Sequence, residues 1–195
     1  MAEIEVPNAE ELEELRAKTF TRRVALTTAI FAVLLAITSL GGNNAMKEML
    51  LAQQLASDQW AYYQSKAMRE HLYRTNILRT ELDLLERGAA MKPAVRKQFD
   101  AMLRDMKAEE ARFKSEKVKI QDEAKGLEAE RDRNRAKDPY FDYAEVLLQI
   151  AIVMASISIL AASRQIFIFS SACAALGTIL MLNGYLLLFK IPFLH

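Results

Sequence analysis

The side chains that most often act as nucleophiles or metal ligands are scarce in this chain. It contains two histidines, His71 and His195, and a single cysteine, Cys173. A zinc site or a catalytic triad needs several such groups at defined spacings, and these three residues form no such pattern. The six glycines form no phosphate-binding loop. We therefore expect no enzyme activity, no catalytic residues, no bound metal and no cofactor.

The carboxylates are numerous but are balanced by basic residues. The chain has 25 acidic and 26 basic side chains and a net charge of +1. Alternation of the two signs along a helix is typical of a solvated surface. Because the whole chain carries almost no net charge, nucleic acid is not an expected partner.

Charged residues are absent from three stretches, 24–46, 146–163 and 165–189. A hydrocarbon layer of about 30 Å needs a helix of about 20 apolar residues, and each stretch is close to that length. The first follows a 23-residue amino terminus and is interpreted as an uncleaved signal anchor. The predicted segments are an N-terminal amphipathic segment (1–23), transmembrane helices at 24–43, 141–163 and 165–189, and a C-terminal tail (190–195).

Residues 44–137 lie between the first and second apolar stretches and predict an extramembrane helical hairpin. Its arms are 44–87 and 93–137, because Gly88 suits a helix end and Pro93 suits the first turn of the next helix. At 1.5 Å per residue each arm would be about 65 Å long. The Gly-Gly-Asn-Asn element at 41–44 predicts a break or kink before the hairpin, and Asp138-Pro139 predicts its end.

A heptad in the returning arm predicts a coiled-coil-like contact between the arms. The residues that recur every seven positions are Phe99, Met106, Phe113, Ile120 and Leu127. The outgoing arm has an apolar stripe that is predicted to face them, made of Leu51, Leu55, Tyr62, Met68, Leu72, Leu78, Leu82 and Leu85.

Two further features of the hairpin each have two interpretations. The aromatic cluster Trp60, Tyr62 and Tyr63 indicates either packing between the arms or a surface for a partner. Trp60 and Tyr63 lie off the apolar stripe, which favours a contact with a second copy. The basic run at the foot of the returning arm indicates either lipid headgroup binding or a solvated helix end; it consists of Arg131, Arg133, Arg135 and Lys137.

Within the predicted spans, Gln149 and Asn183 lie at similar depths on either side of the turn at Arg164. We predict that their amides meet, within one chain or between copies, because polar groups in hydrocarbon need partners. Small residues at four-residue spacing, such as Ala151 and Ala155, predict close helix contacts that include contacts between copies.

The basic residues that flank the spans predict an orientation. Lys18, Arg22 and Arg23 precede the first span, and Arg164 lies between the last two. The positive-inside rule places these residues in the cytoplasm and the hairpin outside.

Residues 35–66, LAITSLGGNNAMKEMLLAQQLASDQWAYYQSK, resemble a family of bacterial membrane proteins, domain of unknown function 4337. The GGNN element followed by SDQWAYYQ is the specific part of this likeness. The resemblance implies a multi-pass protein of the bacterial inner membrane with three spans. It implies no activity, ligand or catalytic residue.

These observations predict an all-α membrane protein with three transmembrane helices and a long antiparallel hairpin between the first and second. The expected function is that of a non-enzymatic, homo-oligomeric membrane scaffold or interaction protein that projects helical stalks. Its expected partners are membrane lipid, other copies of itself and an unidentified protein. The alternative is an oligomeric pore or a transport accessory subunit.

Overall fold

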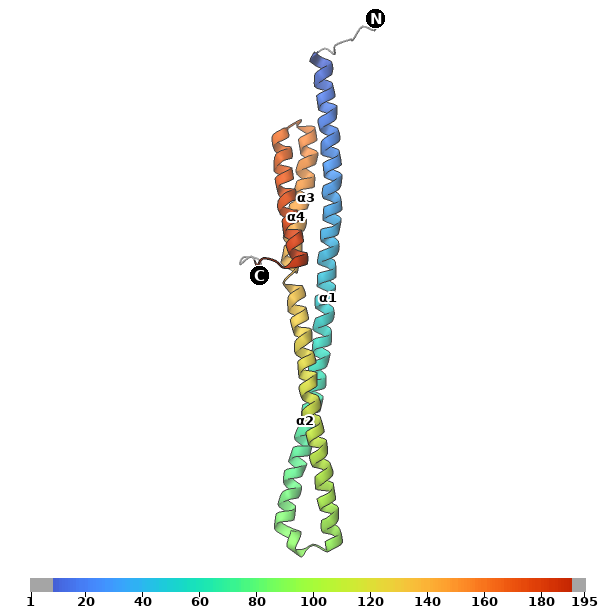
Figure 1. Cartoon of the computed structure of the whole chain (residues 1–195), viewed down its shortest axis with the longest axis vertical. Helices are drawn as coiled ribbons and strands as arrows, with labels where there is room; N and C mark the ends of the chain where they lie inside the picture. The colour runs from blue at the N-terminus through green and yellow to red at the C-terminus, as the bar shows by residue number, and fades with distance from the viewer. Residues whose placement is uncertain (1–8, 191–195) are drawn as a thin grey trace. The chain divides into compact units, whose positions relative to one another are not determined.

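The computed structural model describes residues 9–190, with side chains described for residues 13–190. The described part is helical and contains no strand, which confirms the expected all-α fold (Figure 1). The start of the predicted amphipathic segment (1–8) and most of the C-terminal tail (191–195) lie outside the described residues. The helices are α1 (Ala9–Arg87), a 3-10 turn (Gly88–Ala90), α2 (Pro93–Arg135), α3 (Asp138–Leu160) and α4 (Arg164–Leu186).

The helix boundaries agree with the turn signals at all but one place. Pro93 begins α2, and Pro139 lies in the first turn of α3, where its missing N–H costs no hydrogen bond. The predicted break at residues 41–44 is wrong, because α1 continues through it as one helix of 79 residues. A glycine inside a helix costs only about 1 kcal/mol relative to alanine, which packing can offset.

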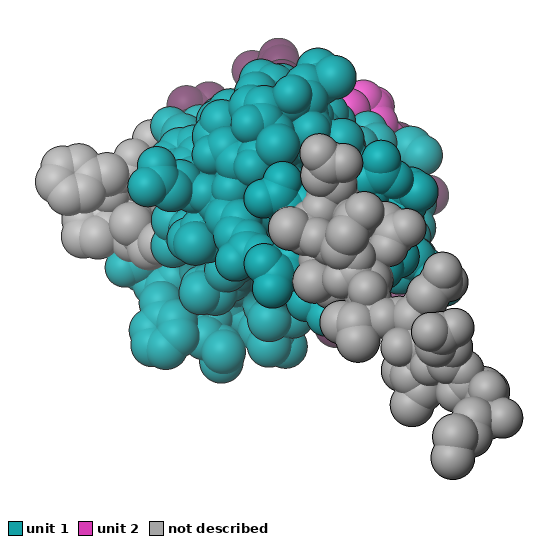
Figure 2. All heavy atoms as spheres, turned by 90° about the horizontal axis from the view of Figure 1, so that it is seen from above, with its two compact units in different colours: residues 1–48, 133–195 teal, residues 49–132 magenta. Residues whose placement is uncertain are grey.

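The chain forms two compact units. Unit 1 comprises residues 1–48 and 133–195, and unit 2 comprises residues 49–132; Figure 2 shows them in teal and magenta. Three helical segments are long and apolar enough to cross a membrane, within Glu13–Ala90, Pro93–Leu160 and Arg164–Leu186.

In unit 1, α3 and α4 lie side by side and pack through small residues (Figure 1). The Ser170 hydroxyl donates a hydrogen bond of 2.6 Å to the backbone carbonyl of Ala151. A Cβ on Gly177 would lie 3.1 Å from the carbonyl oxygen of Ala144. Ala155 is fully buried. The small residues therefore serve the α3–α4 contact within one chain, and their predicted contact with other copies stays a prediction.

The N-terminal part of α1 packs against α3 and α4 through two apolar clusters. Phe31 contacts the cluster around Leu148 and Cys173, and the Cys173 thiol is buried there. Ala45 packs with Phe141 and Met181 in the second cluster.

Phe141 explains the glycine pair in α1. Its ring is 2% exposed and meets the Tyr185 ring edge-on at 4.9 Å between centroids. A Cβ on Gly41 would lie only 2.6 Å from this ring and from the Tyr185 hydroxyl oxygen. On the α4 side, a Cβ on Gly184 would lie 3.1 Å from the same ring. The glycines are therefore required by close packing around Phe141 and not by a change of chain direction.

Unit 2 is the antiparallel pair formed by the C-terminal part of α1 and α2. The turn between them is fixed by Arg96, whose guanidinium donates a 3.2 Å hydrogen bond to the carbonyl oxygen of Gly88. The expected helical hairpin is therefore present in the described residues.

Candidate interaction surfaces

The side of α1 that faces α2 in unit 2 is not the predicted leucine stripe. Its buried residues are Ala52, Ala56, Glu70, Ile77 and Thr80. With the half-buried residues between them, these positions repeat at alternating spacings of three and four, the pattern of a heptad seam. The sequence prediction chose the wrong face of α1 because it followed the largest apolar side chains.

The predicted stripe instead lies on the outer side of α1, except that Leu55 and Tyr62 at its edge line a shallow hollow with Leu127 of α2. Leu51, Leu72 and Leu82 are 60%, 58% and 59% exposed. The remaining members of the stripe are also exposed: Leu55, Tyr62, Met68, Leu78 and Leu85. This outer stripe is the main apolar surface of unit 2, and patches of this kind on soluble surfaces often mark interaction sites.

The heptad of α2 lies where it was predicted, on the inner side of the hairpin. Phe113 and Ile120 are buried, and Phe99, Met106 and Leu127 are half-buried.

Phe113 packs against Tyr73, with 5.7 Å between ring centroids. Met102, which lies three residues after Phe99, is 46% exposed. The second seam position of each heptad in α2 is the one four residues later. It is occupied by Leu103, Glu110, Lys117 and Ala124, which are half-buried or buried.

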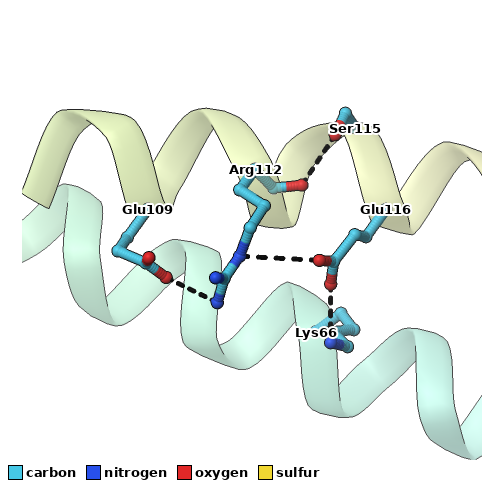
Figure 3. A network of polar contacts seen from close by, with 5 residues as sticks. All are labelled: Lys66, Glu109, Arg112, Ser115 and Glu116. Atoms are coloured by element: carbon cyan, nitrogen blue, oxygen red, sulfur yellow. Dashed lines mark hydrogen bonds and ion pairs between the residues drawn. The ribbon is translucent and has the colours of Figure 1, made fainter.

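Charged side chains cross the seam at its centre. The Lys66 ammonium lies 2.6 Å from the Glu116 carboxylate, and the Lys117 ammonium binds Glu70. Figure 3 shows that Arg112 also contacts Glu116 (3.5 Å) and Glu109 (2.6 Å), so Glu116 joins two cations.

These contacts shift the proton equilibria of three groups. The hydrogen bond to Glu116, followed by that to Tyr62, raises the pKa of Lys66. The hydrogen bond from Lys66 lowers the pKa of Glu116, and the hydrogen bond to Glu70 raises the pKa of Lys117. Each shift favours the charged form, so the seam is built to hold charges.

Further polar contacts follow the same seam toward the open end of the hairpin. The Trp60 indole N–H donates to Glu128 at 3.0 Å, and the Gln59 amide donates to Glu123 at 3.2 Å. Glu123 is therefore a hydrogen-bond acceptor at the edge of the seam.

Trp60 and Tyr63 belong to the contact between the arms. Their rings meet edge-on at 5.4 Å, and the Lys117 ammonium lies 5.7 Å from the centre of the Tyr63 ring. This favours the packing interpretation of the aromatic cluster. The prediction that Trp60 and Tyr63 form the surface for a second copy rested on their being off the seam, and the structure places them on it.

The basic run is divided between local contacts and solvent. Arg131 contacts Asp132 at 2.8 Å and donates to the Gln53 amide oxygen. The Lys137 ammonium donates to the Asn134 side chain at 2.8 Å. Arg133 and Arg135 are exposed in the last turn of α2. The structure brings no two of these four residues into one built site.

Gln149 and Asn183 do not meet within the chain. The Gln149 amide donates to Glu145, one turn earlier on α3, and its side chain is exposed. Asn183 is buried and closes the end of α4, where it accepts from the Phe189 N–H at 2.9 Å and donates to the Phe189 carbonyl at 2.8 Å. The predicted intramolecular pair is therefore wrong, because Leu187 adopts a left-handed conformation that turns the following backbone toward Asn183.

No group of three or more metal-ligating side chains occurs among the residues that the structure describes. Comparison with curated proteins and with solved structures gives no match. A family model described as Domain of unknown function (DUF4337) matches residues 20–187, which include all three apolar segments and the hairpin. The match covers most of the chain, and the chain therefore belongs to this family.

Proposed function

We propose that this protein is a non-enzymatic interaction protein of the bacterial inner membrane that associates with further copies of itself through the outer stripe of unit 2. Three apolar segments separated by charged sequence support membrane insertion. The scarcity of nucleophiles and metal ligands in the sequence supports a role in binding rather than in catalysis.

The observation that carries this proposal is the exposure of the outer stripe. Seven aliphatic side chains and one tyrosine of a highly charged hairpin are left uncovered by its own partner helix; they range from Leu55 at 43% to Leu85 at 82% exposed. A second copy would offer the same stripe, so two hairpins can cover each other in a symmetric contact. Burial of apolar surface contributes about 25 cal/mol per Å², which favours this contact over exposure to water.

The test is mass measurement of the full chain in native nanodiscs, for the wild type and for the double variant Leu72→Glu with Leu82→Glu. We expect an oligomer for the wild type and a monomer for the variant, because carboxylates in an apolar contact lose hydration without gaining partners.

The matched control is Gln64→Glu with Asn76→Glu, which adds the same charge to exposed polar positions of the same arm. This control should remain oligomeric. A wild-type monomer at micromolar concentration, or an oligomer that survives the leucine substitutions, would overturn self-association through the stripe. Ion flux across sealed liposomes that contain the wild-type chain tests the alternative, an oligomeric pore or transport accessory subunit.

The proposed orientation keeps the amino terminus in the cytoplasm and the hairpin outside, on the basis of Arg22, Arg23 and Arg164. Ser115 is an exposed position of the hairpin suited to labelling. We expect a Ser115→Cys variant in a Cys173→Ser background to react with a membrane-impermeant thiol reagent in intact spheroplasts. Protection from the reagent would reverse the orientation.

A further inference from the structure

One end of unit 1 contains a hollow between α1 and α4. Its volume is about 590 Å³, and three arginines line it: Arg16 and Arg23 from α1, and Arg164 from the start of α4. Its apolar wall includes Phe20, Phe167 and Ile168. A volume of this size is within the range of about 300–1,000 Å³ that is usual for ligand pockets.

A second, smaller hollow of about 260 Å³ adjoins the same residues. It is lined by Arg16, Phe20 and Arg164 together with residues from the end of α3, among them Ile159. The two hollows therefore share two guanidinium groups. Each also has an apolar wall of its own.

The three arginines are not neutralised by a salt bridge in the described part of the chain. No aspartate or glutamate lines either hollow, and none of the three arginines forms a salt bridge with a described residue. The carboxylate of Glu14, on the same helix, lies 3.5 Å from Lys18. Arginine binds phosphate oxygens in a bidentate manner, so the site suits a phosphate-bearing anion.

The position of the hollows along the helices identifies the kind of anion. Arg23 directly precedes the uncharged stretch 24–46, and Arg164 precedes the uncharged stretch 165–189. The rings of Phe20 and Phe167 meet edge-on at 6.0 Å, so the beginnings of the two uncharged stretches lie close together. Cations at the ends of apolar helices lie at the headgroup level of a bilayer, and the apolar walls continue toward its hydrocarbon.

We propose that this end of unit 1 is a binding site for an anionic phospholipid. Arg16, Arg23 and Arg164 bind the phosphate, and the apolar walls at Phe20, Phe167 and Ile168 contact the acyl chains. The positive end of α4 adds to the attraction, since the helix begins at Arg164. The proposal rests on the membrane insertion of the proposed function, but not on self-association through the hairpin.

The test is native mass spectrometry of the full chain in mild detergent, titrated with phosphatidylglycerol or with phosphatidylcholine. We expect phosphatidylglycerol to bind at least about tenfold more tightly, because only its headgroup carries a net negative charge. Arg16→Gln with Arg164→Gln should remove this preference. Arg23→Gln should weaken phosphatidylglycerol binding about fivefold.

Arg22→Gln is the matched control, because Arg22 is exposed like its neighbour Arg23 but lines neither hollow. It should leave the affinity unchanged, and an effect equal to that of Arg23→Gln would overturn the site by showing that only surface charge matters. Inorganic phosphate added at millimolar concentration should not compete; full competition would overturn the lipid assignment in favour of a free anion. A chain that inserts into nanodiscs but binds both lipids equally would overturn the site alone. A chain that does not insert would overturn membrane insertion and the site together.

Discussion

The two units of this protein use opposite packing rules. In unit 1 the contact between α3 and α4 is made by small side chains and glycine, and large aliphatic groups such as Ile168 and Leu182 face outward. In unit 2 the contact between α1 and α2 contains ion pairs, and leucines of α1 again face outward. Outward apolar groups suit a lipid environment, where they cost nothing. On a charged hairpin they support the proposed contact with a second copy.

The two contacts differ because the apolar helices need a source of attraction, whereas the charged helices need a fixed register. Between apolar helices in lipid there is no hydrophobic drive toward association, so close approach of backbones provides the attraction. Between charged helices in water, burial of apolar side chains favours association but does not fix the register of the two helices. Polar residues at seam positions fix the register at a cost in stability. Lys66, Glu70 and Lys117 fit this role in unit 2.

The largest effect is expected where a large ring fills the glycine-lined site of unit 1. Phe141→Ala should lower the free energy of unfolding by about 3–5 kcal/mol, because it removes a buried ring and leaves a cavity. Phe169→Ala is the control, since that ring is 53% exposed, and it should change stability by less than about 0.5 kcal/mol. Detergent-based unfolding followed by circular dichroism measures both. Equal losses would show that unit 1 is not organised around Phe141.

The next largest effect is expected in unit 2, when the charge of Glu70 is removed first alone and then together with that of Lys117. Glu70→Leu should destabilise the hairpin by about 1–3 kcal/mol, because it leaves the Lys117 ammonium in the seam without its acceptor. Adding Lys117→Leu should restore most of this loss.

Glu81→Leu is the control, because its partner Lys107 and Glu81 itself are more exposed; it should cost no more than about 1 kcal/mol. Urea unfolding provides the measurement. A double variant as unstable as Glu70→Leu would mean that the seam depends on the ion pair for stability and not only for register.

Two glycine substitutions should change stability in opposite directions. Gly41→Ala places a Cβ at 2.6 Å from Phe141 and Tyr185, and should destabilise unit 1 by about 1–3 kcal/mol. Gly126→Ala in α2 meets no atom within 4 Å, and should stabilise unit 2 by up to about 1 kcal/mol through helix propensity. Thermal unfolding of each variant measures whether stability rises or falls relative to the wild type. Stabilisation by Gly41→Ala would contradict the close packing of α1 in unit 1.

The smallest effect is the pH dependence of unit 2. The lowered pKa of Glu116 contributes stability above its ordinary value of 4.5, and this is lost as the pH falls through the folded-state pKa. The raised pKa values of Lys66 and Lys117 contribute stability below 10.5, and this is lost as the pH rises through their folded-state pKa values.

Stability in urea should therefore show a plateau between these limits and decrease on both sides. Glu116→Gln should flatten the acid side, while the alkaline side keeps the contribution of Lys117 and Glu70. An acid side that is unchanged in this variant would assign the pH dependence to other carboxylates.

The sequence by itself determined the helices, the turn of the hairpin and the apolar segments. Proline, the helix-ending Gly88 and long uncharged stretches act locally, so their effects can be read without knowing what packs against them. The heptad of Phe113 and Ile120 was also readable, because large residues at a strict seven-residue period define one helix face.

Tertiary structure decided which face of α1 meets α2. Leucine is the most obvious seam residue, yet the seam uses Ala52, Ala56 and Glu70. Their choice depends on partners in α2 about 50 residues away, such as Lys117 for Glu70, which no local pattern contains.

The same reason explains the glycine pair and the two amides. Gly41 has the local signature of a break, but its role is set by the rings of Phe141 and Tyr185, which come from other helices. Asn183 was expected to need a partner at its own depth, and it found one six residues away because the backbone after α4 turns back. Local chemistry fixed which segments are helical, and contacts distant in sequence fixed what each helix face does.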